Sequence, residues 1–353
     1  MIEVDGSQGE GGGQVLRSAL SLSVITSKAI HVKNIRANRS SPGLKSQHLK
    51  AVDAAAAISK ADVQGSSLNS DSILFSPREL RTGRYKVDIP TAGSTSLVLQ
   101  TIFVPLSLAK SATSMIISGG THVPWSPSYD YLSLHWMEFL KNSGFDAQLK
   151  LELAGYYPQG KGRITAIIRP TSHINPLKLT ERGALKRIIG ISSVSNLNIQ
   201  IADRQKRRAI LHLQKISPEI NIKTINMPSK FKGTSLLIVA EFEDGHENII
   251  PACCYFALGE KGKKAELVAD EVVEALKIFL STDGAIDQYL ADQLLLPLTF
   301  ASGISKYRTS QITQHLLSNA EIIKLFTRTQ IDIEGKIGES GLVKIIPEEY
   351  APE

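Results

Sequence analysis

Cysteine is nearly absent from this sequence of 353 residues. The only two, Cys253 and Cys254, are adjacent, which disfavours a disulfide between them and offers no metal-ligand spacing. No apolar run approaches the ~18 residues that a membrane span needs, and the longest, near Leu294 to Ala301, is broken by Pro297. The first residues are neither basic nor followed by an apolar stretch, unlike a signal peptide. We therefore expect a cytoplasmic protein with no membrane partner.

Neither aromatic residues, at 6%, nor charges of one sign dominate the composition. With 42% hydrophobic and 21% charged residues, the composition excludes a disordered, collagenous or coiled-coil chain. The length predicts two or three compact units, each able to bury a core. The 40 Lys and Arg against 34 Asp and Glu leave a net charge of +6, which permits an anionic partner without requiring one.

Short strand-like runs alternate with segments of helical apolar spacing, which predicts an α/β (α+β) fold. We expect strands at 31–35, 85–89 and 114–118 and helices at 43–59, 93–110 and 130–143. Three segments, 61–77, 145–170 and 331–347, share a strand, a glycine-containing turn, an alternating strand and a proline. This recurrence predicts three or four stacked βαβαββ units. An α/β protein without repeats would show a similar texture, so that alternative stays open.

The pattern changes between residues 177 and 257. A helix that carries the basic run Arg204 to Arg208 is followed by alternating strands at 220–225 and 234–242. This predicts a small inserted α/β domain at 177–257 within a large catalytic domain formed by 1–176 and 258–353, to which a helix at 265–281 returns the chain. The basic run is either a solvated helix face or a surface that contacts RNA.

The densest chemical signal is a glycine-rich segment from Asp5 to Arg17. Four glycines surround Glu10 directly before an apolar-periodic helix, so the backbone can approach a ligand and present helix N–H groups to an anion such as phosphate. The segment lacks the Gly-Lys-Ser/Thr ending of a P-loop and the register of a dinucleotide fingerprint. A glycine-rich turn without function is the alternative, and it leaves Glu10 and Arg17 unexplained.

Three further polar segments lie at predicted helix entrances. Arg36 and Arg39 precede a helix whose first turns hold Gln47 and His48, and guanidinium groups bind phosphates bidentately. The segment 93–96, followed by Gln100, and the segment 289–293 open two other helices. Solvated arginines, a structural histidine and simple helix caps are the alternatives for these segments.

His315 lies in the segment 311–321, where Ser318 and Glu321 have the spacing of a capping box. The spacing predicts a helix from about Asn319, with His315 just before it. A neutral imidazole is available there as a nucleophile near neutral pH, although a lone histidine among apolar neighbours also suits core packing. The other histidines have no metal-ligand spacing.

Taken together, the motifs resemble those of the RNA 3′-terminal phosphate cyclases over nearly the full chain. The matching segments are Asp5 to Arg17, Ile35 to Leu49, Ala92 to Gln100, Ser118 to Thr121, Tyr157-Pro158, Gly259 to Lys261, Tyr289 to Pro297 and His315 to Asn319. The resemblance implies a large domain of repeated βαβαββ units, similar to the enolpyruvyl transferases, with a small inserted α/β domain.

The resemblance also implies an activity, a ligase-type nucleotidyl transfer. ATP, with Mg²⁺ or Mn²⁺, converts an RNA 3′-phosphate into a 2′,3′-cyclic phosphodiester through a covalent histidine–AMP intermediate. The residues that match catalytic positions are His315, which matches the nucleophile, Glu10, Arg17, Arg36, Arg39, Gln47 and His48. Those that match nucleotide-site positions are Gln100, Pro127, Tyr289, Leu290, Ala291, Asp292 and Gln293. Glu10 and Asp292 are the expected metal ligands, since both offer hard oxygens.

The residue types suit this chemistry, because phosphoryl transfer depends mainly on positioning and charge stabilisation. Closing the ring requires a 2′-hydroxyl, so RNA rather than DNA is the expected partner. Ser46 and Lys161 depart from the family pattern without touching the nucleophile. A non-enzymatic relative in ribosome assembly is the alternative function; it lacks the nucleophilic histidine, so His315 favours the enzyme. An enolpyruvyl transferase has only the fold in its support, and the oligomeric state stays unknown.

Overall fold

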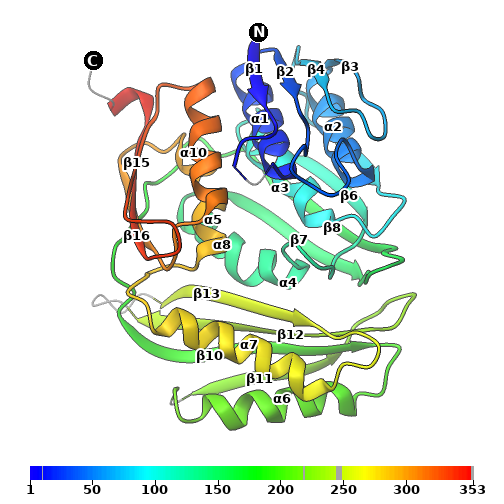
Figure 1. Cartoon of the computed structure of the whole chain (residues 1–353), viewed down its shortest axis with the longest axis vertical. Coiled ribbons are helices and arrows are strands. Elements are labelled where there is room, and N and C mark those ends of the chain that lie inside the picture. Colours follow the sequence, from blue (N-terminus) through cyan, green and yellow to red (C-terminus); the bar gives the residue numbers. More distant parts are fainter. Residues whose placement is uncertain (10, 218, 244–248, 351–353) are drawn as a thin grey trace.

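The computed structural model describes residues 1–9, 11–217, 219–243 and 249–350, and in these the chain forms four sheets of four strands (Figure 1). Three of the sheets share one strand order: the first two strands of each are parallel neighbours, and the last strand in sequence pairs antiparallel with both the second and the third. The strand orders are β1-β2-β4-β3, β5-β6-β8-β7 and, reversed, β9-β14-β16-β15. The predicted repeat of βαβαββ units is thus confirmed.

The three units are continuous in sequence apart from one insertion. The first consists of β1 (Ile2–Asp5), α1 (Gly13–Thr26), β2 (Ile30–Lys33), α2 (Ser46–Ser59), β3 (Asp62–Gln64) and β4 (Ile73–Ser76). The second consists of β5 (Arg84–Asp88), α3 (Thr95–Ser107), β6 (Thr113–Gly119), the consecutive helical segments α4 (Tyr129–Tyr131), η1 (Leu132–Trp136) and α5 (Met137–Asn142), then β7 (Asp146–Leu153) and β8 (Gly162–Arg169). The third consists of β9 (Lys178–Leu179), α8 (Gln288–Gln293), α9 (Leu295–Leu298), β14 (Ser305–Thr309), α10 (Gln314–Phe326), β15 (Gln330–Glu334) and β16 (Gly341–Ile346), and a short η2 (Glu348–Tyr350) follows.

Helices of different units pack against one another: α1 contacts α3 and α10, and α2 contacts α3. The predicted apolar spacing of α2 explains its part in this core, because Val52, Ala55 and Ile58 are fully buried. The first turns of α1 and α10 meet the last turn of α8 in this arrangement, as the contacts below show. None of the helices in the described residues is long and apolar enough to cross a membrane.

The fourth sheet belongs to the segment between β9 and α8. It consists of β10 (Ala184–Ser195), β11 (Ile220–Asn226), β12 (Gly233–Glu243) and β13 (Ile249–Leu258), in the order β11-β10-β12-β13, with α6 (Gln200–Leu213) and α7 (Ala265–Leu280). Both helices cover the lower face of this sheet in Figure 1. The sequence analysis expected α7 to return the chain to the large domain. Its apolar stripe, including Val268 and Val272, joins the core beneath the small sheet.

The division into a large domain, 1–176 and 258–353, and an inserted domain, 177–257, stays a prediction. Two observations bear on its bounds. Lys178 and Leu179 of β9 pair with β14 of the third unit, whereas α7, beyond residue 257, packs on the small sheet. We therefore propose that the inserted unit extends from about β10 to the end of α7.

Candidate active site

The glycine-rich segment leads into the N-terminus of α1, as the sequence predicts. Gly12 is the N-cap and has no side chain to satisfy the first N–H groups of this helix of 14 residues, and such N–H groups attract anions. Gly9 has a φ of +60°, and a Cβ there would lie 1.9 Å from Ser318 Oγ, so only glycine lets the segment pass so close to α10. Glu10, predicted as a catalytic residue and metal ligand, lies outside the described residues.

Arg17 and His48 lie beside the first residue of α1. A Cβ at Gly13 would lie 2.3 Å from His48 Nε2 and 3.0 Å from an Arg17 Nη atom. The Lys45 backbone N–H donates to His48 Nδ1 (3.3 Å), so the ring proton is on Nε2. Burial, with help from the charges of Arg17, Arg36 and Lys45, lowers the pKa of His48 to about 3. His48 is therefore neutral, and the positive charge comes from Arg17, whose pKa burial lowers only to about 10.

The two predicted arginines, Arg36 and Arg39, make different contacts. Arg36 has a φ of +58°, and its Nη1 donates to the carbonyls of Ser41 (2.7 Å) and Gly43 (2.9 Å), so this guanidinium holds its own loop. Arg39 approaches the N-terminus of α1, because a Cβ at Gly12 would lie 3.0 Å from its Nη2. The structure thus places Arg39, more directly than Arg36, beside the N-terminus of α1.

His315 is the second residue of α10 and does not precede it. The helix begins at Gln314 after the N-cap Thr313, whose Oγ1 accepts from the Leu316 N–H (3.1 Å). The predicted start near Asn319 is wrong, because Ser318 Oγ donates to the Gln314 carbonyl within the helix (2.7 Å) and does not act as a cap. His315 therefore stands in the first turn of a helix.

Gln14, which the sequence analysis missed, joins two predicted residues. Its Nε2 donates to Asp292 Oδ2 (2.5 Å), and its Oε1 contacts His315 Nδ1. Since Oε1 can only accept, His315 Nδ1 carries the proton and Nε2 carries the ring lone pair. The signal that points to Gln14 is its place in the first turn of the helix that follows the glycines.

Asp292 lies between these helices with 9% of its surface exposed. Burial raises the pKa of its carboxyl to about 7, against the opposing effects of Gln14 and Arg17. Its backbone carbonyl accepts from Asn319 Nδ2 (2.8 Å), and Asn319 Oδ1 accepts from Ser18 Oγ (2.7 Å). These bonds tie α1, α8 and α10 into one site.

The remaining predicted residues fall into three groups. Gln47 Oε1 accepts from the Ser94 N–H (2.9 Å) at the start of α3, and Gln100 Nε2 donates to Gln293 Oε1 (2.8 Å), so both pairs join neighbouring units. Tyr289 is 54% exposed on α8, and Pro127 is half-buried before α4. The side chains of Leu290 and Ala291 are fully buried.

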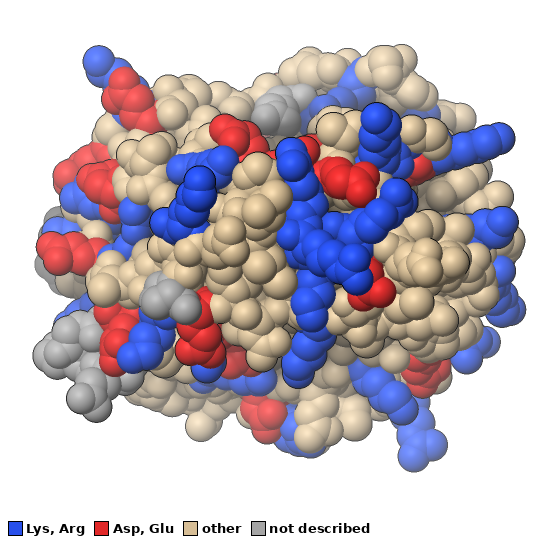
Figure 2. All heavy atoms as spheres, turned by 90° about the horizontal axis from the view of Figure 1, so that it is seen from below, with Lys and Arg blue, Asp and Glu red and all other residues tan. Residues whose placement is uncertain are grey.

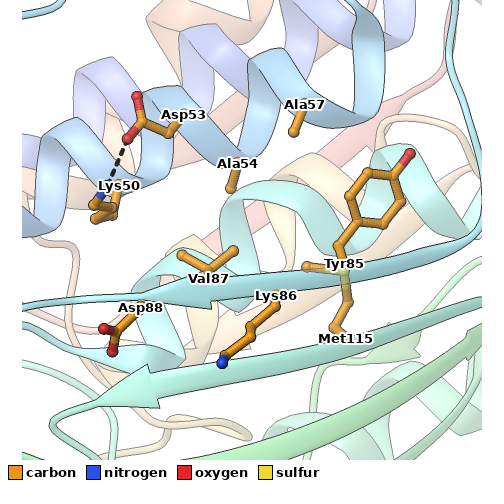
Figure 3. A pocket seen from close by; sticks show the side chains of 9 residues that line it. All are labelled: Lys50, Asp53, Ala54, Ala57, Tyr85, Lys86, Val87, Asp88 and Met115. Atoms are coloured by element: carbon orange, nitrogen blue, oxygen red, sulfur yellow. Dashed lines mark hydrogen bonds and ion pairs between the residues drawn. The ribbon is translucent and has the colours of Figure 1, made fainter.

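Two other surface features lie apart from these residues. The pocket in Figure 3, between α2 and β5, has lysines and aspartates over an apolar base, and none of the predicted site residues lines it. The basic run is on α6; Figure 2, seen from below, shows Lys and Arg gathered near the centre of that face with acids beside them. Two members of the run pair with α7, Arg208 with Asp270 (2.7 Å) and Arg204 with Glu266 (3.7 Å).

The geometry thus joins a histidine, a buried carboxylate and arginines at a helix N-terminus suited to phosphate. Residues 8–333 match the sequence profile of the family described as RNA 3′-terminal phosphate cyclase. The chain belongs to this family. The relatives that carry this name include those of Archaeoglobus fulgidus (38% identical; 95% of this chain, 98% of the relative), Gloeothece citriformis (38%; 94% and 95%) and Methanopyrus kandleri (38%; 99% and 99%). Membership in the RNA 3′-terminal phosphate cyclases identifies the chain as an enzyme.

Proposed function

We propose that this cyclase uses ATP to convert an RNA 3′-terminal phosphate into a 2′,3′-cyclic phosphodiester, with AMP carried transiently on His315. The observation that carries the proposal is the chain of contacts from His315 through Gln14 to Asp292. It directs the lone pair of a neutral imidazole to Nε2, which is what a nucleophilic histidine needs. Family membership and the anion-binding end of α1 support it.

In the first step, His315 Nε2 attacks the α-phosphorus of ATP. A P–N bond forms, the bond to the β-phosphate oxygen breaks, and pyrophosphate leaves. Gln14 accepts from Nδ1 and holds the ring in this orientation while positive charge develops on it. Arg17, Arg39 and the N–H groups of α1 offset the charge on the phosphate oxygens, which is the main task in phosphoryl transfer.

In the second step, an oxygen of the RNA 3′-phosphate attacks the same phosphorus and displaces the His315 nitrogen. The neighbouring 2′-hydroxyl then loses its proton and attacks the RNA phosphorus, a ring P–O bond forms, and AMP leaves with the oxygen that joined it. Arg17, Arg39 and the N-terminus of α1 offset the charge on the phosphate oxygens in this step as well, because the reacting phosphates occupy the same site in both steps. The need for a 2′-hydroxyl makes RNA the substrate.

Among the described residues no group of three or more His, Cys, Asp or Glu side chains could hold a metal ion, and Asp292 is the one predicted metal ligand that they include. Asp292 offers hard oxygens, and burial raises the pKa of its carboxyl to about 7. A bound Mg²⁺ or Mn²⁺ would compensate the charge of this carboxylate and offset charge on the ATP phosphates. Asp292 would hold the ion, and Glu10 is the second carboxylate that the family resemblance implies.

The first prediction tests the nucleophile. Wild-type protein incubated with α-labelled ATP, without RNA, should retain label after denaturation, and His315→Ala should retain none while its circular dichroism is unchanged. His173→Ala, which alters an exposed histidine, is the matched control and should label normally. Label on His315→Ala would contradict the assignment, and no label on any variant would favour the non-enzymatic scaffold.

A further inference from the structure

A fully exposed tryptophan stands on the loop between β6 and α4. Trp125 is 100% exposed, and its backbone has a φ of +62°, a conformation that a bulky residue adopts only when its surroundings impose it. Tryptophan normally buries much of its large apolar surface. The position therefore calls for a ligand that covers the ring.

The loop that carries Trp125 is anchored on both sides. His122 contacts Asp130 (Nε2 to Oδ2, 2.9 Å) and Thr121 (Nδ1 to Oγ1, 2.8 Å), and all three side chains are buried. The Tyr129 N–H donates to the Thr121 carbonyl (2.9 Å) and closes the loop. Because the frame is fixed, the indole is presented to solvent at little further cost in conformational entropy.

A second exposed aromatic ring lies on the adjacent turn. Tyr157 is 71% exposed. Its neighbour Tyr156 forms a parallel bridge with His122, and the N–H groups of Thr121 and His122 both donate to the Gly155 carbonyl (2.9 and 3.0 Å). The two loops therefore run side by side, with one exposed ring on each.

Three exposed lysines lie on the same turn and on a loop that packs against it. Lys161 is exposed at the end of the same turn, and Lys230 and Lys232 are exposed on a loop of the small unit. That loop packs on the turn, because the Ala154 N–H donates to the Pro228 carbonyl (2.8 Å). These three lysines form no ion pair with any residue in the described part of the chain, so their charge is available to an anion.

The loops border the candidate active site. Gly120 forms a bridge with Ser94, whose N–H donates to Gln47. On the other loop, a Cβ at Gly160 would lie 2.8 Å from Ala92 Cα. The segment 91–94 thus contacts both aromatic loops on one side and the predicted site residue Gln47 on the other.

We propose that Trp125 and Tyr157 form a platform on which unpaired bases next to the RNA 3′ end stack, while Lys161, Lys230 and Lys232 neutralise the phosphates between them. Aromatic rings with flanking cations are how proteins bind single strands without reading their sequence. The proposal rests on the proposed function, which places an RNA end at this site. The adenine of ATP is the other nucleobase that these rings could stack on, so the experiment separates ATP from RNA.

Fluorescence gives a test that needs no catalysis, because the chain has only two tryptophans and the other, Trp136, is buried. A 3′-phosphorylated oligoribonucleotide should quench the exposed tryptophan of the wild type, and Trp125→Phe should abolish the quench. An oligonucleotide with abasic sites at its last positions should quench much less. Equal quenching by ATP alone, or no quenching by RNA, would overturn the proposal.

Kinetics give the second test. Trp125→Ala and Tyr157→Ala should each raise the KM for RNA roughly tenfold, the loss expected for one stacked base, whereas Trp125→Phe and Tyr157→Phe should stay near wild type. Self-labelling with ATP should be unchanged in all four. Ile278→Ala, at an exposed apolar residue on α7, is the control. Slower labelling in the alanine variants would assign the rings to ATP and overturn the proposal.

Charge gives the third test. Changing Lys161, Lys230 and Lys232 to serine should raise the KM for RNA and flatten its dependence on salt. Changing Lys206 and Arg207 of α6 to glutamate tests the other basic surface. A loss confined to the α6 variant would place RNA on α6 and overturn the proposal. If the wild type neither labels itself nor cyclises RNA, the proposed function fails, whereas base-dependent quenching would still show that the platform binds RNA.

Discussion

At the scale of single residues, the site depends on an amide that sets the tautomer of a histidine. An isolated imidazole exchanges its proton between two nitrogens, and the partner of one nitrogen decides which atom holds the lone pair. Gln14 is itself oriented, because its Nε2 donates to Asp292 and leaves only Oε1 to meet His315. The residue types of His315 and Asp292 suggested their roles from the sequence, whereas the residue type of Gln14, which lies between them, did not.

The second prediction concerns this amide. Gln14→Leu removes the acceptor at Nδ1, so self-labelling should slow by about 10²-fold, the cost of misplacing a reacting group by about 1 Å. Single-turnover labelling measures the rate, and Gln214→Leu, at an exposed glutamine after α6, is the control. Unaltered labelling in Gln14→Leu would show that the ring needs no such partner.

The third prediction concerns pH. The pKa of His48 is about 3 in the folded chain and about 6.5 when unfolded, so below pH 6.5 the unfolded state takes up a proton that the folded state refuses. The free energy of unfolding should therefore fall as pH falls from 6.5 towards 3, by up to about 1.4 kcal/mol per pH unit. His48→Gln should remove this part of the slope in urea unfolding at pH 6.5 and 5.0, and His173→Gln, at an exposed histidine, should not. Equal slopes in wild type and His48→Gln would mean that His48 is protonated when folded.

At the scale of helices and strands, local patterns predicted the elements well and one boundary badly. The strands at 31–35 and 114–118 and the helix at 43–59 were expected within a few residues of β2, β6 and α2, because their periodicity is set by burial on one face. The start of α10 was misplaced because two hydroxyl residues compete as caps, and packing rather than spacing selects Thr313.

A buried carboxylate positions α8, the helix that carries Asp292. Asp287 Oδ1 accepts from the N–H groups of Tyr289 and Leu290 (both 2.9 Å), and Oδ2 contacts His135 Nε2 (2.8 Å) and accepts from the Cys254 N–H (3.1 Å). The side chain is fully buried. It therefore links the start of α8 to η1 and to the small sheet.

The fourth prediction follows from this cap. Asp287→Asn would keep the shape of the side chain but replace one carboxylate oxygen by an NH₂ group. That group would face either the capping N–H groups of Tyr289 and Leu290 or the N–H of Cys254, at a cost of about 1–3 kcal/mol. We expect a lower Tm together with slower self-labelling, because Asp292 and Gln14 lose their alignment. Thermal unfolding and labelling measure the two effects. Asp283→Asn, an exposed neighbour paired with Arg308, should change neither; wild-type behaviour of Asp287→Asn would remove the positioning role.

At the scale of the whole molecule, the site is built from residues far apart in sequence. Gln14 and His315 are 301 residues apart, as are Ser18 and Asn319, so no local pattern could show that they meet. The glycine, arginine and histidine motifs identified separate segments of the site in the sequence, and the packing of three similar units brings these segments together. The bounds that we propose for the inserted unit differ from those expected from the sequence, because β9 is only two residues long and α7 has an apolar stripe that suits either core.

The small sheet has two apolar faces, which bears on how the molecule unfolds. Leu237 and Val239 of β12 belong to the core of the three repeated units, whereas Leu236 and Ile238 belong to the core beneath α6 and α7. This alternation follows from the period of a strand. Detaching the inserted unit would expose the first face to water, so we expect the chain to unfold as one cooperative body.

The fifth prediction tests this cooperativity with Leu236→Ala, a change confined to the core beneath α6 and α7. In a Trp125→Phe background the remaining tryptophan, Trp136, reports from the core of the repeated units, where it packs on Phe103 at 4.8 Å. The substitution should cost about 2–5 kcal/mol. In one cooperative body, urea unfolding followed by Trp136 fluorescence and by far-UV circular dichroism should shift to the same lower midpoint. Leu237→Ala, which alters the opposite face of the strand, should do the same. If the Trp136 transition stayed in place while the dichroism of Leu236→Ala changed first, the inserted unit would unfold independently of the site that it supports through Cys254 and Asp287.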